Sequence, residues 1–310
     1  MITKAQPLLS IVIANYNYGR FLEEAIQSVV SQDMGDKVEL IICDAASSDN
    51  SVDIIKKYAN GLPPNTSYYD WIKNNPSLAT NDHRLTTKIT WWCSEKDGGQ
   101  SAAFNKGFSH ARGKYLTWLN ADDILIRGSL RKVTVQMELH PECEWFTGNF
   151  IRFLPDGKMC EVSWGPHWYP RWLQKGHSPV VAFGPTTFFS KKVFEAEGGF
   201  YEELHYIMDA DLWERFMMHG IKQRRLNFYC WGFRMHEDSK TAEFGDHVVS
   251  DKVSTAIREE KRVSLMRSGY YCSRIMTFAN RITRILDGSF MRGIWLKRRF
   301  LGRSIKELNI

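Results

Sequence analysis

Residues 115–125, with the sequence YLTWLNADDIL, decide the expected fold. The first half of this stretch is an apolar, aromatic-rich run typical of a buried parallel strand. The run ends abruptly at Asn120-Ala121-Asp122-Asp123, so two carboxylates directly follow the strand. Open α/β sheets bind their ligands at the carboxyl edge of such strands. The stretch therefore predicts a parallel sheet with a ligand site beyond its end.

The two carboxylates have two interpretations. One is that Asp122 or Asp123 caps a following helix, because apolar residues keep roughly helical spacing from Leu125 until Pro141 stops them. The other is that their hard oxygens hold Mg²⁺ or Mn²⁺, which in turn holds a nucleotide diphosphate. Two adjacent acids do not decide between the interpretations, so the rest of the chain must.

Strands and helices alternate through the first half of the chain. Apolar runs that predict strands are each followed by residues at helical spacing, in the order strand 8–14, helix 21–30, strand 38–43, helix 52–58, strand 88–93 and helix 103–111. This pattern is typical of an α/β fold, a mostly parallel sheet wound with helices. Residues 60–88 lack a clear period and are expected to form a long loop.

The second half is more mixed. A hairpin is expected around Pro155-Asp156-Gly157, and the Trp-rich segment 164–185 is interpreted as either a binding loop or a packing segment. Short helices and a strand follow, at 190–197, 210–218 and 228–235. From residue 251 the sequence is helical and basic, which predicts a helical C-terminal extension.

Composition narrows the class of protein. The 310 residues carry 41 Lys and Arg against 35 Asp and Glu, but residues 251–310 contribute 14 of the basic and only 5 of the acidic ones. The basicity therefore belongs to the tail, and no nucleic acid partner is expected. The six scattered cysteines predict reduced thiols, and neither a signal peptide nor a membrane span is evident. A cytoplasmic protein is expected.

The usual phosphate-binding loops are missing. No G-x-G-x-x-G follows the first strand, and no G-x-x-x-x-G-K-[ST] occurs in the sequence. A dinucleotide oxidoreductase and a P-loop enzyme are therefore disfavoured. A metal on strand-end carboxylates is another way to neutralise bound phosphate.

Four motifs in series carry a family resemblance. They are SIVIANYNYGRFLEEAIQSVVSQ, ELIICDAASSDNS, SEKDGGQSAAFNKGFSHARGKYLTWLNADD and PTTFFSKKVFEAEGGFYEELHYIMDADLWERF. In this order they resemble family 2 glycosyltransferases of the GT-A fold, bacterial enzymes that move a sugar from a nucleotide-sugar to an acceptor. The resemblance implies a GT-A domain over residues 1–240, with a nucleotide-sugar half at 1–123 and an acceptor half at 124–240. Residues 241–310 form the extension.

The resemblance assigns the donor site residue by residue. Asn15 and Tyr16 occupy positions that contact the nucleotide base, and Asp44 the position of a carboxylate that accepts the uracil N–H. The alternative for Asp44 is a turn or cap residue. Lys240 is in a position to steady the diphosphate as a point charge.

The same resemblance implies a divalent metal, Mg²⁺ or Mn²⁺. Asn120 and Asp122 fall on the two acidic positions of the family's D-x-D motif. The Asn leaves Asp122 as the main metal carboxylate, with Asp123 in support. His236 lies where relatives place a residue near the metal and diphosphate, and its alternative is a structural histidine.

The general base implied by the resemblance is Asp209, in the sequence MDADLW. The acceptor hydroxyl must lose a proton as it attacks the anomeric carbon, and a carboxylate opposite the leaving diphosphate accepts it. Asp211 is the rival candidate. Met208 stands where the family usually has Glu.

The leading hypothesis is an inverting transferase that uses a UDP-sugar and a saccharide or lipid-linked acceptor in bacterial surface polysaccharide synthesis. The alternatives are a nucleotidyltransferase of related fold and an inactive sugar-binding or scaffold protein. The tail, residues 270–310, mixes basic and bulky apolar residues. It predicts either an amphipathic helix packed on its own domain or a partner, or peripheral binding to the anionic inner face of the cell membrane.

Overall fold

The computed structural model describes residues 6–75, 87–167, 182–239, 251–268 and 274–308. The chain forms two compact units, each made of two separated stretches. The first unit is Met1–Leu139 with Phe188–Glu202, and the second is His140–Thr187 with Glu203–Ile310. These boundaries differ from those expected after residues 123 and 240, because the C-terminal helices belong to the same unit as residues 140–187.

The first unit is built on a parallel sheet. Its strands lie in the order β3 (Lys88–Ser94), β2 (Val38–Asp44), β1 (Leu9–Asn15) and β4 (Tyr115–Asn120). The short β8 (Thr187–Ser190) pairs antiparallel with the start of β4. Strands β1 and β2 are almost wholly buried, as expected of near-continuous apolar runs covered on both faces. The predicted α/β class is confirmed.

Helices follow the strands of this unit in the predicted order. They are α1 (Gly19–Val30), η1 (Gly35–Lys37), α2 (Ser51–Ala59), α3 (Tyr68–Asn74), α4 (Gln100–His110), α5 (Ser129–Leu139) and α6 (Lys191–Ala196), with the two-residue β5 (Ile124–Leu125) before α5. Helix α3 corrects the expectation of a loop over residues 60–88. It has seven residues and buries only Ile72, too short a pattern to show helical periodicity. Residues 76–86 lie outside the described chain.

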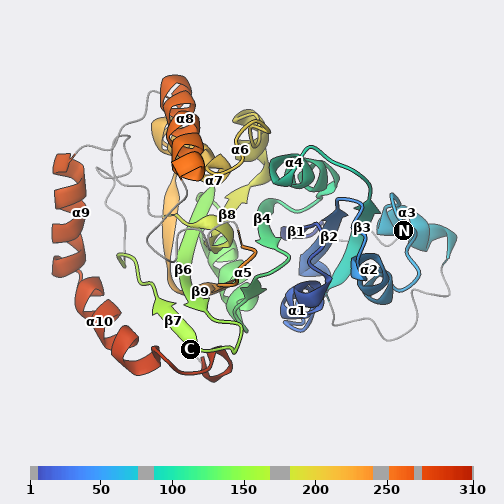
Figure 1. Cartoon of the computed structure of the whole chain (residues 1–310), viewed down its shortest axis with the longest axis horizontal. Coiled ribbons are helices and arrows are strands. Elements are labelled where there is room, and N and C mark those ends of the chain that lie inside the picture. Colours follow the sequence, from blue (N-terminus) through green and yellow to red (C-terminus); the bar gives the residue numbers. More distant parts are fainter. Residues whose placement is uncertain (1–5, 76–86, 168–181, 240–250, 269–273, 309–310) are drawn as a thin grey trace. The chain divides into compact units, whose positions relative to one another are not determined.

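Helix α4 packs on β1 and β2, as Figure 1 shows. Gly107 makes the close approach possible, since a Cβ there would lie 2.4 Å from Cγ1 of Val12. An aromatic cluster continues the core beside it. Phe108 meets Phe194 edge to face at 5.0 Å between ring centroids, and Trp118 meets Phe200 at 5.4 Å. Each such buried ring stabilises the fold by about 1.5–3 kcal/mol.

The second unit pairs β6 (Trp145–Phe153) with β7 (Met159–Val162) and with the parallel β9 (Gln223–Arg234). The predicted hairpin is confirmed, and Gly157 has the positive φ that its turn requires. The helical elements of this unit are η3 (Gly184–Thr186), α7 (Met208–Met218), α8 (Asp251–Ser268), α9 (Arg274–Leu286), α10 (Ser289–Phe300) and η5 (Ile305–Glu307). Residues 168–181 of the expected Trp-rich loop lie outside the described chain.

Candidate active site

The sheet register aligns polar strand ends in the first unit. Asn15 lies opposite Asp44, Asp44 opposite Ser94, and Asn120 opposite Ala14. These residues end β1, β2, β3 and β4, which are parallel, so their side chains line one carboxyl edge of the sheet. This is the edge where open α/β sheets bind ligands.

Asp44 is the centre of a hydrogen-bond network at this edge. Its Oδ1 accepts from Asn15 Nδ2 (2.6 Å) and Ser47 Oγ (2.5 Å). Its Oδ2 accepts from the Ser47 N–H (3.0 Å) and Ser94 Oγ (2.6 Å). A carboxylate offers about four lone-pair sites, so protein donors occupy all of them, and the side chain is only 1% exposed. This arrangement suits the turn-residue interpretation of Asp44, because these four donors leave no acceptor site for a uracil N–H while they are in place.

Ser47 and Ser94 are not among the residues predicted from the sequence. A signal for Ser47 was present, because Asp side chains often accept hydrogen bonds from the backbone of the turn that follows them. Ser94 is recognised only from the strand register that sets it opposite Asp44, and the sequence alone does not reveal that register. Gln100 begins α4 and reaches Asn120, 20 residues later, only through the packing of that helix against the sheet.

Tyr16 is the exposed member of the expected base site, at 61% relative exposure. The loop around it is fixed by neighbours: Asn17, in the left-handed region at φ 55°, accepts the Ser48 N–H through Oδ1 (2.8 Å). The Asn17 N–H in turn donates to Ser47 Oγ (2.8 Å). The loops after β1 and β2 are thus joined, and the phenol ring of Tyr16 is left at the surface, where a base can stack on it.

The acidic residues after β4 have different environments. Asp123 is fully buried, and its Oδ2 accepts from Asn120 Nδ2 (2.8 Å). Asn120 Oδ1 accepts from Gln100 Nε2 (2.9 Å), at the start of α4. Asp122 is half-buried. Of the two carboxylates, Asp122 is therefore the one with an exposed part. The capping interpretation is wrong, because β5 and a turn separate both acids from Ser129, where α5 begins.

A divalent cation fits this edge in one specific way. Within the described ranges, no group of three or more His, Cys, Asp or Glu could hold a metal ion by itself. Mg²⁺ commonly uses only one or two carboxylates and takes its other ligands from substrate phosphates and water. Asp122 meets that requirement, and Asp123 is placed to orient Asn120.

His236 and Lys240 belong to the second unit. His236 follows β9 and is 8% exposed, and its carbonyl accepts from both the N–H (3.1 Å) and Oγ (2.9 Å) of Ser239. The backbone of His236 thus begins a tight turn after β9. Lys240 lies outside the described residues.

Asp209 is the second residue of α7 and is half-buried. Its carboxylate accepts from the N–H groups of Ala210 (2.8 Å) and Gly184 (3.3 Å). Burial raises the pKa of Asp209 above its ordinary value, and these N–H groups only partly offset the effect. A raised pKa makes a carboxylate a stronger base, as general-base chemistry requires.

The rival carboxylate, Asp211, has a structural environment. It is fully buried and forms an ion pair with Arg215, one turn later in α7, at 2.9 Å. A charge held this way is costly to disrupt, so Asp211 is poorly suited to exchange protons with a substrate. Trp213 also serves the core, since it is 1% exposed and stacks on Trp145 at 5.6 Å.

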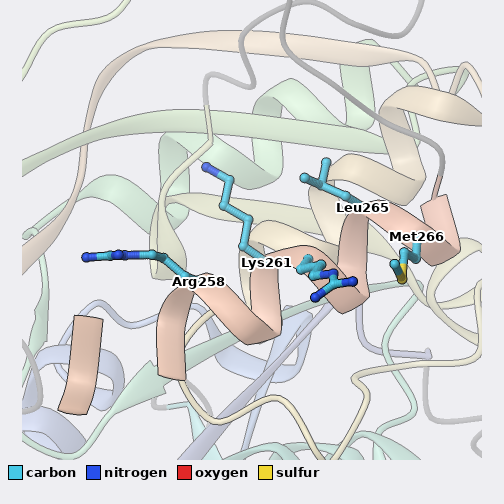
Figure 2. A pocket seen from close by; sticks show the side chains of 5 residues that line it. Arg258, Lys261, Leu265 and Met266 are labelled. Atoms are coloured by element: carbon cyan, nitrogen blue, oxygen red, sulfur yellow. The ribbon is translucent and has the colours of Figure 1, made fainter. Parts of the chain in front are cut away.

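One hollow in the described surface is lined by α8 alone. Five side chains of α8 line it, namely Arg258, Lys261, Arg262, Leu265 and Met266. Figure 2 shows all five and labels every one except Arg262. The hollow contains none of the residues predicted from the sequence, and a single helix supplies its whole lining.

Comparison with known proteins identifies the family to which the chain belongs. The model of glycosyl transferase family 2 matches residues 10–82 and 91–196, more than half of the chain. The chain belongs to this family. The matched region includes the strand-end residues of the first unit and stops before Asp209.

Individual relatives of this family 2 chain are distant. An uncharacterised glycosyltransferase of Nostoc sp. is 34% identical over 125 residues, which cover 40% of this chain and 31% of the relative. The chondroitin synthase of Pasteurella multocida is 24% identical over 237 residues, which cover 75% of this chain and 21% of the synthase. The chain thus spans about a third or less of the length of these curated relatives.

Solved structures show the same fold. S. aureus TarS 1–349 in complex with UDP-GlcNAc matches with a TM-score of 0.54 and 16% identity, over 83% of this chain and 66% of that one. The mannosyltransferase PcManGT from Pyrobaculum calidifontis, in complex with GDP-Man and Mn²⁺, matches with a TM-score of 0.50 and 16% identity, over 77% and 60%.

Proposed function

We propose that this chain is an inverting glycosyltransferase that takes a sugar from a nucleotide-sugar, with UDP as the carrier, and gives it to a saccharide or lipid-linked saccharide. The observation that carries the proposal is the alignment of Asn15, Asp44, Ser94 and Asn120 at one sheet edge. Family membership supports it. Relatives with polysaccharide names, among them a chondroitin synthase and a minor teichoic acid biosynthesis protein, support a surface-polysaccharide product.

Each residue has a chemical role in this proposal. The Tyr16 ring stacks on the base, and the Asp44 network holds the loops that surround it. The Asp209 carboxylate accepts the proton of the acceptor hydroxyl as its oxygen bonds to the anomeric carbon. The bond from that carbon to the diphosphate breaks on the opposite face, so the configuration inverts.

A divalent cation belongs to the proposal. Asp122 would hold Mg²⁺ or Mn²⁺ together with diphosphate oxygens and water, with Lys240 and His236 as further candidates near the diphosphate. The ion would offset the negative charge that develops on the leaving diphosphate. The bound Mn²⁺ named for the mannosyltransferase of similar fold is consistent with such use.

A donor screen tests the proposal. Thermal shift and hydrolysis are measured with a panel of UDP- and GDP-sugars, with and without Mn²⁺. We expect metal-dependent stabilisation and release of free sugar with at least one donor, and loss of both in Asp122→Ala but not in Asp53→Ala, whose carboxylate is exposed on α2. Release of pyrophosphate from a nucleoside triphosphate would favour the nucleotidyltransferase. Donor binding without turnover would favour the scaffold protein.

We also propose that the chain works at an anionic membrane surface, through α9. None of the described helices is both long and apolar enough to cross a membrane. Helix α9 instead turns its apolar side to solvent: Leu286 is 81% exposed, Ile275 78% and Phe278 64%. Ile285 and Ile282 extend the same side, at 62% and 40%.

The polar side of α9 faces its own unit. Thr283 is 7% exposed, Arg284 donates to the carbonyl of Trp164 (2.8 Å), and Asp287 accepts the N–H of His167 (2.9 Å). The expectation that an apolar stripe packs on its own domain is therefore wrong for α9. It holds for part of α10, where Leu296 and Phe300 are buried.

The charged residues beside the apolar side of α9 indicate what kind of surface it would bind. Arg274 and Arg281 project beside the apolar arc at 100° per residue, and both are exposed. An apolar arc flanked by arginines suits the boundary between anionic headgroups and acyl chains. A lipid-linked acceptor would be found at the same surface.

A further inference from the structure

We propose that Glu260, on α8, is a positioning residue for Asp209. The inference rests on the proposed role of Asp209 as the base. Glu260 lies outside the residues matched by the family model, so this device belongs to the C-terminal part of the chain and not to the common sheet.

The Glu260 carboxylate binds the chain immediately before α7. Three consecutive N–H groups donate to it: His205 to Oε1 (2.9 Å), and Tyr206 (2.9 Å) and Ile207 (3.2 Å) to Oε2. Ile207 is the N-cap of α7 and has no side-chain cap of its own. A residue 53 positions later in the sequence therefore fixes the backbone where this helix begins.

The carboxylate also has the favourable charge for this place. The N-terminus of a helix carries a partial positive charge, and an anion near it is stabilising. Hydrogen bonds to a charged acceptor are about twice as strong as those between neutral groups. Glu260 therefore holds residues 205–207 more firmly than a neutral side chain would.

The three hydrogen bonds from residues 205–207 to the Glu260 carboxylate are called the anchor below. Asp209 lies two residues beyond Ile207, the last residue of this anchor. Its carboxylate is oriented by the N–H groups of Gly184 and Ala210, and both contacts depend on where the first turn of α7 sits. A small shift of a reacting group costs much activity, about 100-fold for a misplacement near 1 Å. Loosening the anchor should therefore reduce proton transfer.

Two further contacts extend the anchor along α8. Ser264 Oγ donates to Glu214 (3.1 Å), and Arg267 donates to Glu203 (2.6 Å). Residues 260, 264 and 267 follow the i, i+4, i+7 spacing of one helix face. At 100° per residue, the five residues that line the hollow fall on the opposite side of α8 from Glu260. Substitutions at Glu260 therefore leave that lining in place.

The first test measures the anchor without any assay of activity. Hydrogen exchange of the amides of residues 205–209 is compared in the full-length wild type, Glu260→Ala, Glu260→Gln and Glu259→Gln, the last an exposed neighbour on α8. We expect exchange at least tenfold faster in the Ala variant, an intermediate rate in the Gln variant and no change in the control. Unchanged exchange in both Glu260 variants would overturn the proposal. If the Ala variant does not fold, the Gln variant carries the test.

The second test is a double-variant cycle with Asp209→Asn. Glu260→Ala alone should lower kcat about 10-fold to 100-fold while the Kd for the donor stays unchanged. In the Asp209→Asn background, Glu260→Ala should lower kcat by less than about twofold, because its effect acts through the carboxylate that this background lacks. An equal loss in both backgrounds would overturn the proposal. Full activity of Asp209→Asn would instead refute the assignment of the base, and the exchange result would still stand.

Discussion

Asp209 is the residue on which the transfer step depends most directly. Asp209→Asn keeps the size of the side chain but cannot accept a proton, so we expect kcat to fall by about 10² or more. Donor binding should change little, because the role begins only when the acceptor reacts. Steady-state kinetics with and without saturating donor measure both effects. If Asp211→Asn were inactive and Asp209→Asn active, the two roles would be exchanged.

The raised pKa of Asp209 sets the acid limb of the pH profile. Burial favours the protonated form, so the carboxyl keeps its proton to a higher pH than a free aspartate, whose pKa is about 3.9. Only the deprotonated form is a base, so kcat/KM should fall as the pH drops through the raised pKa. A pH–rate profile measures this limb. A limb at the pH of a free aspartate would contradict the account.

Asp44 is expected to contribute to stability and to UDP binding through the hydrogen bonds that its carboxylate accepts. Asp44→Asn places an NH₂ group where one carboxylate oxygen accepts two hydrogen bonds, so at least one donor is left without an acceptor. We expect the free energy of unfolding to fall by about 1–3 kcal/mol and the thermal shift with UDP to decrease. Urea unfolding with and without UDP measures both. Asp53→Asn is the matched control, and equal behaviour of the two variants would show that the network is dispensable.

Among the helices, α4 depends on a glycine that helix propensity disfavours. Ala is favoured over Gly inside a helix by about 1 kcal/mol, yet a Cβ at Gly107 would lie 2.4 Å from Val12 and 3.2 Å from Cys43 Sγ. We expect Gly107→Ala to destabilise the chain by about 1–3 kcal/mol, because overpacking outweighs propensity. Chemical denaturation measures the change.

Gly293 in α10 provides the matched control. A Cβ there would meet Cβ of Trp164 at 3.6 Å, an ordinary contact. Gly293→Ala should therefore be neutral or stabilising by up to about 1 kcal/mol. Stabilisation by Gly107→Ala as well would mean that α4 can move away from the sheet without cost.

At the scale of the whole molecule, charge and exposed apolar area are unevenly distributed. Residues 251–310 carry a net +9, while residues 1–250 carry −3. We expect the full chain to sediment with anionic vesicles at low salt, and the double variant Phe278→Ser with Ile285→Ser to remain in solution. Arg274→Gln and Arg281→Gln should each weaken binding about fivefold, since a basic residue near such a surface contributes about 1 kcal/mol. Added salt should weaken binding as well.

The control for the vesicle assay is Val135→Ser with Leu139→Ser, which removes two exposed apolar side chains from α5 (43% and 63% exposed). It should bind vesicles like the wild type. Equal binding of all variants would remove α9 from the proposal. Concentration-dependent dimerisation that the α9 variant abolishes, without vesicle binding, would make this side a contact between copies of the chain.

The sequence by itself determined the α/β class, the order of strands and helices along the first half of the chain, and the family. Strands such as 9–15 and 115–120 are continuous apolar runs, and local pattern is enough to predict them. The tertiary structure decided what depends on register and distant contacts. It placed Ser94 beside Asp44, and it buried Asp123 while leaving Asp122 partly exposed. It also turned the apolar side of α9 outward, against the expectation that such stripes face a core. Helical periodicity fixes which residues share a face, but only packing decides which face is buried.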